Sequence, residues 1–304
     1  MSGPRPGPAP WVCPVCREDL RSEDGRMTCL AGHAFDEARQ GYVNLLLAGQ
    51  RRSRQPGDTK EMVSARHRFL ATGAYDRLGD AIAHVTQRAA IAAAERGGSA
   101  PLLLDVGCGE GRYTRRVAEA IASGEGVSDP VTAVIAGVDV AKPAVAIAAR
   151  LHPAGWYAVG SAGDLPLPPA AVDVAMGVFG PVLPDELARV VRAGGAVILA
   201  HPGAGHLASL RQLVYDDPRP HEVKDPLRDA GELFAPVGTM TVTFPIALTD
   251  GGQLNDLFAM TPYRWHAPPD IVERLATEAG RPGGFETEVD VIVSSYRRTG
   301  RPWS

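Results

Sequence analysis

Four residues near the start of the chain constrain its fold more than any other feature: Cys13, Cys16, Cys29 and His33. The first two cysteines are separated by two residues, and the third cysteine and the histidine by three. Thiolate and imidazole donors in two close pairs suit tetrahedral zinc, and four protein ligands leave no open position for a substrate. The spacing therefore predicts a structural zinc site. Three buried cysteines beside an unrelated surface histidine are the alternative.

The predicted zinc site divides the chain of 304 residues into segments. Residues 1–10 are rich in proline and lack an apolar core, as expected of a disordered extension and not of a signal peptide. Residues 11–40 are too few to bury a core, so we expect zinc to supply the folding free energy of a separable module. Residues 41–97 are predicted to hold a basic linker, from 42 to 60, and two helices. Residues 98–304 then form a larger domain.

Cysteine usage and hydropathy indicate in which cellular compartment the protein resides. The last of the four cysteines, Cys108, has no spare partner, so the sequence predicts a reducing compartment and no disulfide framework. No apolar run approaches the roughly 18 residues of a membrane span. We therefore expect a cytoplasmic protein without a membrane partner.

Basic residues gather in one stretch of a chain whose net charge is −4. Phosphate contact depends on such a local patch and not on the total charge, so the stretch is a candidate for RNA binding. A solvated connector is the alternative. Only Asp58 and Glu61 oppose the basic residues of this stretch, which are Arg39, Arg51, Arg52, Arg54, Lys60, Arg66 and Arg68.

Strand and helix patterns alternate through the larger domain. Short apolar runs without alternation are typical of strands buried on both faces. The repetition predicts an α/β fold with an open, mostly parallel, doubly wound sheet. Strands are expected at 101–107, 134–140, 156–159, 172–178, 196–200, 239–247 and 286–297, and helices at 59–72, 75–95, from 111, 143–151, 185–191 and from 254.

A glycine-rich turn follows the first strand of this domain. Gly107, Gly109 and Gly111 let the backbone pass close to a ligand and present amides at a helix N-terminus. A glycine pattern alone is weak support, but here it stands between a buried strand and a helix. Asp105 precedes it, and a carboxylate there can pair with the ammonium of an amino-acid moiety.

Two further acids follow the next strands. Asp139 ends the second strand, where a carboxylate can accept the ribose hydroxyls of a nucleoside. Asp164 follows the third strand, where a side chain can reach the exocyclic amine of adenine. Each acid alone is as well explained as a helix cap or a turn residue. Three acids at successive strand ends favour S-adenosylmethionine (SAM) as the ligand.

Together these features resemble a class I SAM-dependent methyltransferase, and more narrowly the RlmA family of 23S rRNA guanine-N1 methyltransferases. That family includes macrolide-resistance members of antibiotic-producing bacteria. The likeness extends over nearly all the chain from residue 11. It is carried by Cys13-Pro-Val-Cys16, Gly32-His-Ala-Phe-Asp36, Gly41 to Leu46, Pro56-Gly-Asp58, Glu61-Met62, Ala65-Arg66, Phe69-Leu70, Asp105 to Gly111, Glu186 to Val190 and Met260-Thr-Pro262.

The resemblance implies roles for individual residues. It makes Cys13, Cys16, Cys29 and His33 the zinc ligands and adds Glu110 to the cofactor loop. Tyr75 and His206 match positions that line the cofactor pocket. Phe179 and Pro181 match the loop that holds the target base, and Phe179 could stack on guanine.

The resemblance also implies the reaction and its setting. A guanine N1 in a hairpin loop of 23S rRNA, in helix 35 of domain II near the macrolide site, would receive the methyl group. A homodimer is expected, and no residue is identified as a general base. Two rivals remain: a small-molecule methyltransferase of antibiotic biosynthesis, which leaves the zinc module unexplained, and a non-catalytic RNA-binding assembly factor, against which the intact glycine loop argues.

Overall fold

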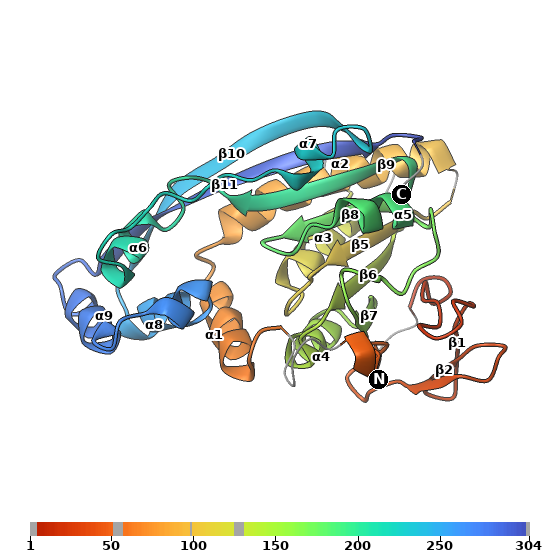
Figure 1. The fold of residues 1–304 in the computed structure, drawn as a ribbon, viewed down its shortest axis with the longest axis horizontal. Helices are drawn as coiled ribbons and strands as arrows, with labels where there is room; N and C mark the ends of the chain where they lie inside the picture. Colours follow the sequence, from red (N-terminus) through yellow and green to blue (C-terminus); the bar gives the residue numbers. More distant parts are fainter. Residues whose placement is uncertain (1–4, 51–56, 98, 125–130, 302–304) are drawn as a thin grey trace.

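The structure is a computed structural model that describes residues 5–50, 57–97, 99–124 and 131–301. The strands of its central sheet are β4 (Tyr42–Asn44), β5 (Leu102–Val106), β6 (Val134–Asp139), β7 (Trp156–Val159), β8 (Val172–Val178), β9 (Val191–Pro202), β10 (Phe234–Leu248) and β11 (Phe285–Arg298). Their order is β10-β11-β9-β8-β5-β6-β7-β4 (Figure 1). Strands from β4 to β9 pair in parallel, and β11 pairs antiparallel with both β9 and β10. The predicted doubly wound, mostly parallel sheet is confirmed.

The predicted helices lie close to their expected positions, but sequence reasoning missed the helices at 208–214, 226–229 and 271–279. In α1, Thr59 caps the N-terminus by accepting a hydrogen bond from the Met62 N–H at 3.3 Å. No helix in the described part of the chain is both long and apolar enough to cross a membrane. The helices are α1 (Lys60–Ala71), α2 (Asp76–Gly97), α3 (Arg112–Ser123), α4 (Lys142–Leu151), α5 (Pro184–Val190), α6 (Ala208–Val214), α7 (Pro226–Asp229), α8 (Gly251–Ala259) and α9 (Ile271–Ala279), with the short 3-10 helices η1 (Ala48–Gln50) and η2 (Pro262–His266).

Successive residues of β5 serve the two faces of the sheet, because side chains alternate along a strand. Leu103 shares a hydrophobic cluster with Ile82 of α2 and Val117 of α3. Leu104 shares a second cluster with Leu187 of α5. The cleft described below lies at the carboxyl ends of the parallel strands, where open α/β sheets bind their ligands.

The N-terminal module completes the second face of the sheet. Its strands β1 (Arg21–Glu23), β2 (Arg26–Thr28) and β3 (Ala34–Asp36) form a small antiparallel sheet, drawn in red beside β6 and β7 in Figure 1. Trp11, Leu20 and Met27, each at most 3% exposed, join the cluster of Leu104. The connection from β7 to β8 contains no helix, and the module covers the face that a crossover helix would otherwise cover.

This packing corrects the expectation of a separable module. The apolar side chains of residues 11–40 are buried against the methyltransferase sheet, so zinc is not the only source of their folding free energy. The predicted linker is also wrong at its start. Tyr42–Asn44 forms the edge strand β4, parallel to β7, and Val43 is fully buried. Sequence reasoning missed this strand because its pairing partner lies more than a hundred residues away.

Candidate functional site

The four predicted zinc ligands converge. Their ligand atoms all lie within 4.8 Å of one another. The Sγ atoms of Cys16 and Cys29 are 3.6 Å apart, and His33 Nδ1 lies 3.6 Å from Cys13 Sγ and 3.4 Å from Cys29 Sγ. Tetrahedral bonds of about 2.3 Å to sulfur and about 2.0 Å to nitrogen separate ligand atoms by roughly 3.5 to 3.8 Å. The cluster therefore fits zinc in a closed shell.

The glycine turn after β5 depends on backbone conformations that favour glycine. Gly107, Gly109 and Gly111 have φ angles of +75°, +54° and +79°. A Cβ atom on Gly111 would lie 2.7 Å from the Cβ of Ala148 on α4. Gly111 is also the N-cap of α3. The missing side chains thus allow α3 to start close to α4, with its first amides facing the turn.

Asp105 is buried and only partly satisfied by hydrogen bonds. It is 2% exposed, and its Oδ2 accepts a hydrogen bond from Thr114 Oγ1 at 2.5 Å. Its Oδ1 is buried and has no hydrogen-bond partner among the described residues. Burial raises the pKa of Asp105 to about 7, against the lowering effect of Thr114. A buried carboxylate oxygen without a partner fits the ammonium group of SAM.

Asp139 lies at the end of β6 with a fixed carboxylate. Its Oδ2 accepts from the Gly109 N–H at 2.9 Å, and its Oδ1 accepts from the Ala141 N–H at 2.7 Å. Burial raises its pKa, while these two backbone hydrogen bonds lower it. Each oxygen keeps a second lone pair for a ribose hydroxyl. Glu110 is also buried nearby, and burial raises its pKa against the opposing effect of Arg66.

A cavity of about 400 Å³ adjoins this turn. A Cβ atom on Gly107 would lie 3.3 Å from Pro181 Cδ, so the cofactor turn touches the loop that follows β8. Phe179 in that loop lines the cavity and is 42% exposed. Its φ of +54° is strained for a bulky residue, and such strain is frequent at functional sites.

Aromatic rings form much of the cavity wall. The rings of Phe179 and His206 have centroids 5.5 Å apart, and Tyr75 meets His206 edge-on at 6.3 Å. The His221 ring stacks on Tyr263 at 6.1 Å, and His221 Nε2 lies 2.8 Å from Tyr263 Oη. A flat heterocycle with polar edges is the kind of ligand that such a wall suits.

His206 presents a defined hydrogen-bond donor. Its Nδ1 accepts from the Asp290 N–H at 3.3 Å, so the neutral ring carries its proton on Nε2. Burial, and then His221, lower the pKa of His206 to about 4. The ring is therefore neutral at physiological pH.

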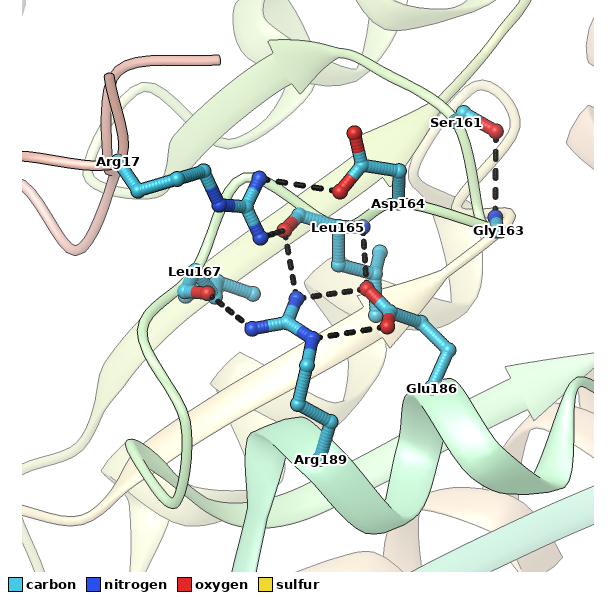
Figure 2. Close-up of polar contacts among 8 residues, drawn as sticks. All are labelled: Arg17, Ser161, Gly163, Asp164, Leu165, Leu167, Glu186 and Arg189. Atoms are coloured by element: carbon cyan, nitrogen blue, oxygen red, sulfur yellow. Dashed lines mark hydrogen bonds and ion pairs between the residues drawn. The ribbon is translucent and has the colours of Figure 1, made fainter. Parts of the chain in front are cut away.

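The structure brings most of the predicted cofactor residues together. Asp105, Glu110, Asp139 and the three glycines surround one turn. Tyr75 and His206, which the resemblance places in the cofactor pocket, line the adjoining cavity with Phe179 instead, and their contact with the cofactor stays a prediction. Asp164 is engaged differently: its Oδ1 accepts from Arg17 of the zinc module at 3.0 Å (Figure 2). Contact between Asp164 and adenine stays a prediction.

The predicted RNA-binding residues do not form one described surface. Lys60 is exposed at the start of α1. Arg66 instead lies in the cleft, where it pairs with Asp58 at 2.5 Å and lines the cavity. Its partner sits only eight residues away in the sequence, and the turn before α1 brings the two together. Arg51, Arg52 and Arg54 lie outside the described residues.

Sequence reasoning missed several residues of the cavity. His201 at the end of β9, His221, Lys224 and Tyr263 all line it. Both ring nitrogens of His201 are buried without a partner among the described residues. The one available signal was Tyr263, which directly follows the motif Met260-Thr-Pro262; the others stand in segments without any motif.

Comparisons with known proteins agree with this geometry. The family model described as RlmA, N-terminal matches residues 11–54, and a methyltransferase domain model matches residues 104–199. A 23S rRNA (guanine(748)-N(1))-methyltransferase of Streptomyces fradiae is 36% identical over 287 residues, which cover 94% of this chain and 95% of that protein. A Micromonospora griseorubida protein, provisionally assigned as a 23S rRNA (guanine-N1)-methyltransferase, is 37% identical over 84% of this chain and 87% of its own length.

Among solved structures, the YcgJ protein from Bacillus subtilis shares 16% identity, with a TM-score of 0.43 over 66% of this chain and 93% of its own. A TM-score this low supports no functional conclusion. The curated relatives and the two family models together show the family. The chain belongs to the RlmA-type 23S rRNA (guanine-N1)-methyltransferases, with a zinc ribbon followed by a SAM-dependent methyltransferase domain.

Proposed function

We propose that this protein transfers the methyl group of SAM to N1 of a guanine in a hairpin loop of 23S rRNA. One observation carries the proposal: the turn that bears Asp105 and Gly107 touches the Phe179–Pro181 loop, and Phe179 and Gly180 of that loop line the aromatic cavity, so the cofactor turn and the cavity lie side by side. The activities of the curated relatives support the choice of rRNA guanine as the acceptor.

The cofactor end of the cleft would bind SAM, and the aromatic cavity would bind the target base. SAM, when bound, supplies a methyl group on a sulfonium that is already electrophilic. Asp105 binds its ammonium and Asp139 its ribose, which fixes the cofactor at the carboxyl ends of β5 and β6. Holding two reactants in line can supply much of the rate acceleration, so no strong general base is required.

The acceptor cavity must bind a base that has left its stack. Phe179 offers a ring for stacking, and the Nε2–H of His206 offers a donor that suits the guanine carbonyl. The cavity would hold N1 toward the methyl group, which SAM would supply while its sulfonium becomes a neutral thioether. The N1 proton leaves to water.

Several finer features belong to the same proposal. The hairpin loop is that of helix 35 in domain II, and methylation there would lower macrolide binding. Lys60 and the basic segment before it would contact the RNA backbone. The protein would act in the cytoplasm as a homodimer, and its mass in solution by light scattering tests that state.

A transfer assay tests the function. Purified protein, tritiated SAM and a transcript of the hairpin should yield labelled 1-methylguanosine on digestion and mass spectrometry. A transcript with adenosine in place of the loop guanine serves as the control and should stay unlabelled. Label on a small molecule but not on RNA would support the small-molecule rival. Absence of SAM binding would support the assembly-factor rival.

A further inference from the structure

One loop joins the cofactor site to the zinc module. Residues 160–167 follow β7, and the Gly160 N–H donates to the Asp139 carbonyl oxygen at 3.0 Å. The loop therefore begins against the residue assigned to the ribose of SAM. Within it, Ser161 Oγ accepts from the Gly163 N–H at 3.1 Å.

The methyltransferase core holds one side of this loop, as Figure 2 shows. Glu186 on α5 accepts from the Leu165 N–H at 2.5 Å. Arg189 on the same helix donates to the carbonyl oxygens of Leu165 at 2.9 Å and Leu167 at 2.8 Å. Arg189 also pairs with Glu186 at 2.6 Å, and both side chains are at most 15% exposed. Two largely buried side chains of the methyltransferase core thus hold the backbone of this loop.

The zinc module holds the other side. Arg17 donates to Asp164 Oδ1 at 3.0 Å and to the Leu165 carbonyl oxygen at 3.4 Å (Figure 2). The Val12 N–H donates to the Pro166 carbonyl oxygen at 2.9 Å. Two residues that flank zinc ligands therefore bind the loop directly.

The position of Arg17 depends on the turn that carries the first two zinc ligands. Its N–H donates to the Cys13 carbonyl oxygen at 2.8 Å, and its φ is +64°. A non-glycine residue holds such a conformation only where its surroundings enforce it. Zinc bound to Cys13 and Cys16 would close this turn and would thereby fix where the Arg17 side chain begins.

We propose that Arg17 is a positioning residue, through which the zinc site holds the loop after β7 in the conformation that binds the adenosine end of SAM. Zinc occupancy then raises SAM affinity although no zinc ligand touches the cofactor. By linkage, SAM raises zinc affinity by the same factor. This inference rests on the cofactor site and not on the identity of the RNA acceptor.

Isothermal titration of Arg17→Ala with SAM tests the proposal. The Arg17–Asp164 pair is partly exposed, with side chains 39% and 44% accessible, so SAM affinity should fall modestly, about two- to fivefold. Arg17→Lys should restore part of it. The matched control is Arg26→Ala, which breaks the exposed Arg26–Asp36 pair between two strands of the same module and should bind SAM like wild type. Zinc content and melting temperature confirm that each variant is folded.

Two further measurements separate positioning from a general loss of stability. Asp164→Asn should weaken SAM binding in the wild-type background and weaken it less in the Arg17→Ala background, because the two residues act through one ion pair. Any loss that remains in the Arg17→Ala background measures direct contact between Asp164 and the cofactor. Zinc affinity, from competition with a chelator, should rise with SAM for wild type and less for Arg17→Ala. Wild-type SAM affinity in zinc-loaded Arg17→Ala would overturn the proposal. Failure of the wild-type protein to bind SAM would overturn the cofactor assignment as well. SAM binding is measured without RNA, so neither result depends on the RNA acceptor.

Discussion

The cofactor end of the cleft and the acceptor cavity are built in different ways. At the cofactor end, the turn from Asp105 to Gly111 contains most of the predicted binding residues within seven consecutive positions, and backbone amides fix the carboxylate of the distant Asp139. The cavity wall instead combines Tyr75 from the segment between α1 and α2, Phe179 after β8, and His221 and Tyr263 from the C-terminal third. Local sequence encodes the first site, and tertiary folding assembles the second.

We expect the largest loss of ligand affinity from a substitution at the cofactor end. Asp105→Ala removes the buried partner of a cationic ligand group, which costs about 3–5 kcal/mol, or a factor of roughly 150 to 5,000 in SAM affinity. Isothermal titration measures this loss, and the zinc content of the variant should equal that of wild type. Asp80→Ala, an exposed acid on α2, is the control. Binding of SAM by Asp105→Ala at wild-type strength would refute the site.

A change in the acceptor wall should affect the RNA and spare the cofactor. Phe179→Ala removes a stacking ring, so kcat/KM for the RNA should fall about tenfold to a hundredfold, with SAM affinity unchanged. Steady-state assays with a hairpin transcript measure the first and titration the second. Val237→Ala, at a 60% exposed position on the outer strand β10, should leave both unchanged. Equal losses for SAM and RNA would mean that the two sites are not distinct.

The raised pKa of Asp105 predicts a pH dependence at the cofactor end alone. The pKa of about 7 means that the free carboxyl group is protonated at lower pH and must lose its proton to pair with the ammonium. SAM affinity should therefore weaken about tenfold per pH unit below about pH 7. It should weaken again above about pH 8, where the ligand amine loses its charge.

Methylthioadenosine is the matched ligand for this experiment, because it lacks the amino-acid end. Its affinity should stay constant between about pH 6 and about pH 8. A parallel decline for both ligands would show that unfolding, and not Asp105, causes the effect.

The smallest expected effect concerns the hydrogen bond in the cavity wall. Tyr263→Phe removes the hydroxyl that lies 2.8 Å from His221 Nε2. One such bond contributes about 0.5–1.5 kcal/mol, so kcat/KM for RNA should fall about two- to tenfold. Tyr215→Phe is the control, because the Tyr215 ring packs edge-on against Tyr263 and keeps this contact without its hydroxyl. Equal losses in both variants would assign the effect to packing.

Features that depend on short-range sequence patterns could be predicted from the sequence. The convergence of the four zinc ligands, the glycine turn between β5 and α3, and the order of strands and helices from β5 to β9 all follow from spacing and periodicity. Sequence reasoning failed where non-local packing decides, as for β4, whose partner strand β7 lies more than a hundred residues further along the sequence. The packing of Trp11 and Met27 against the sheet could not be predicted either, because the four metal ligands of the module give no sign that it contacts another domain.

The most direct test of the central claim is primer extension on 23S rRNA from cells that lack this protein. N1 lies on the Watson–Crick edge of guanine, so a methyl group there stops reverse transcriptase. Wild-type protein should restore a single stop at one hairpin-loop guanine, and the Asp105→Ala variant should not restore it. Identical extension products with the wild-type protein, with the variant and without either would contradict the claim that the two halves of the cleft act together on rRNA.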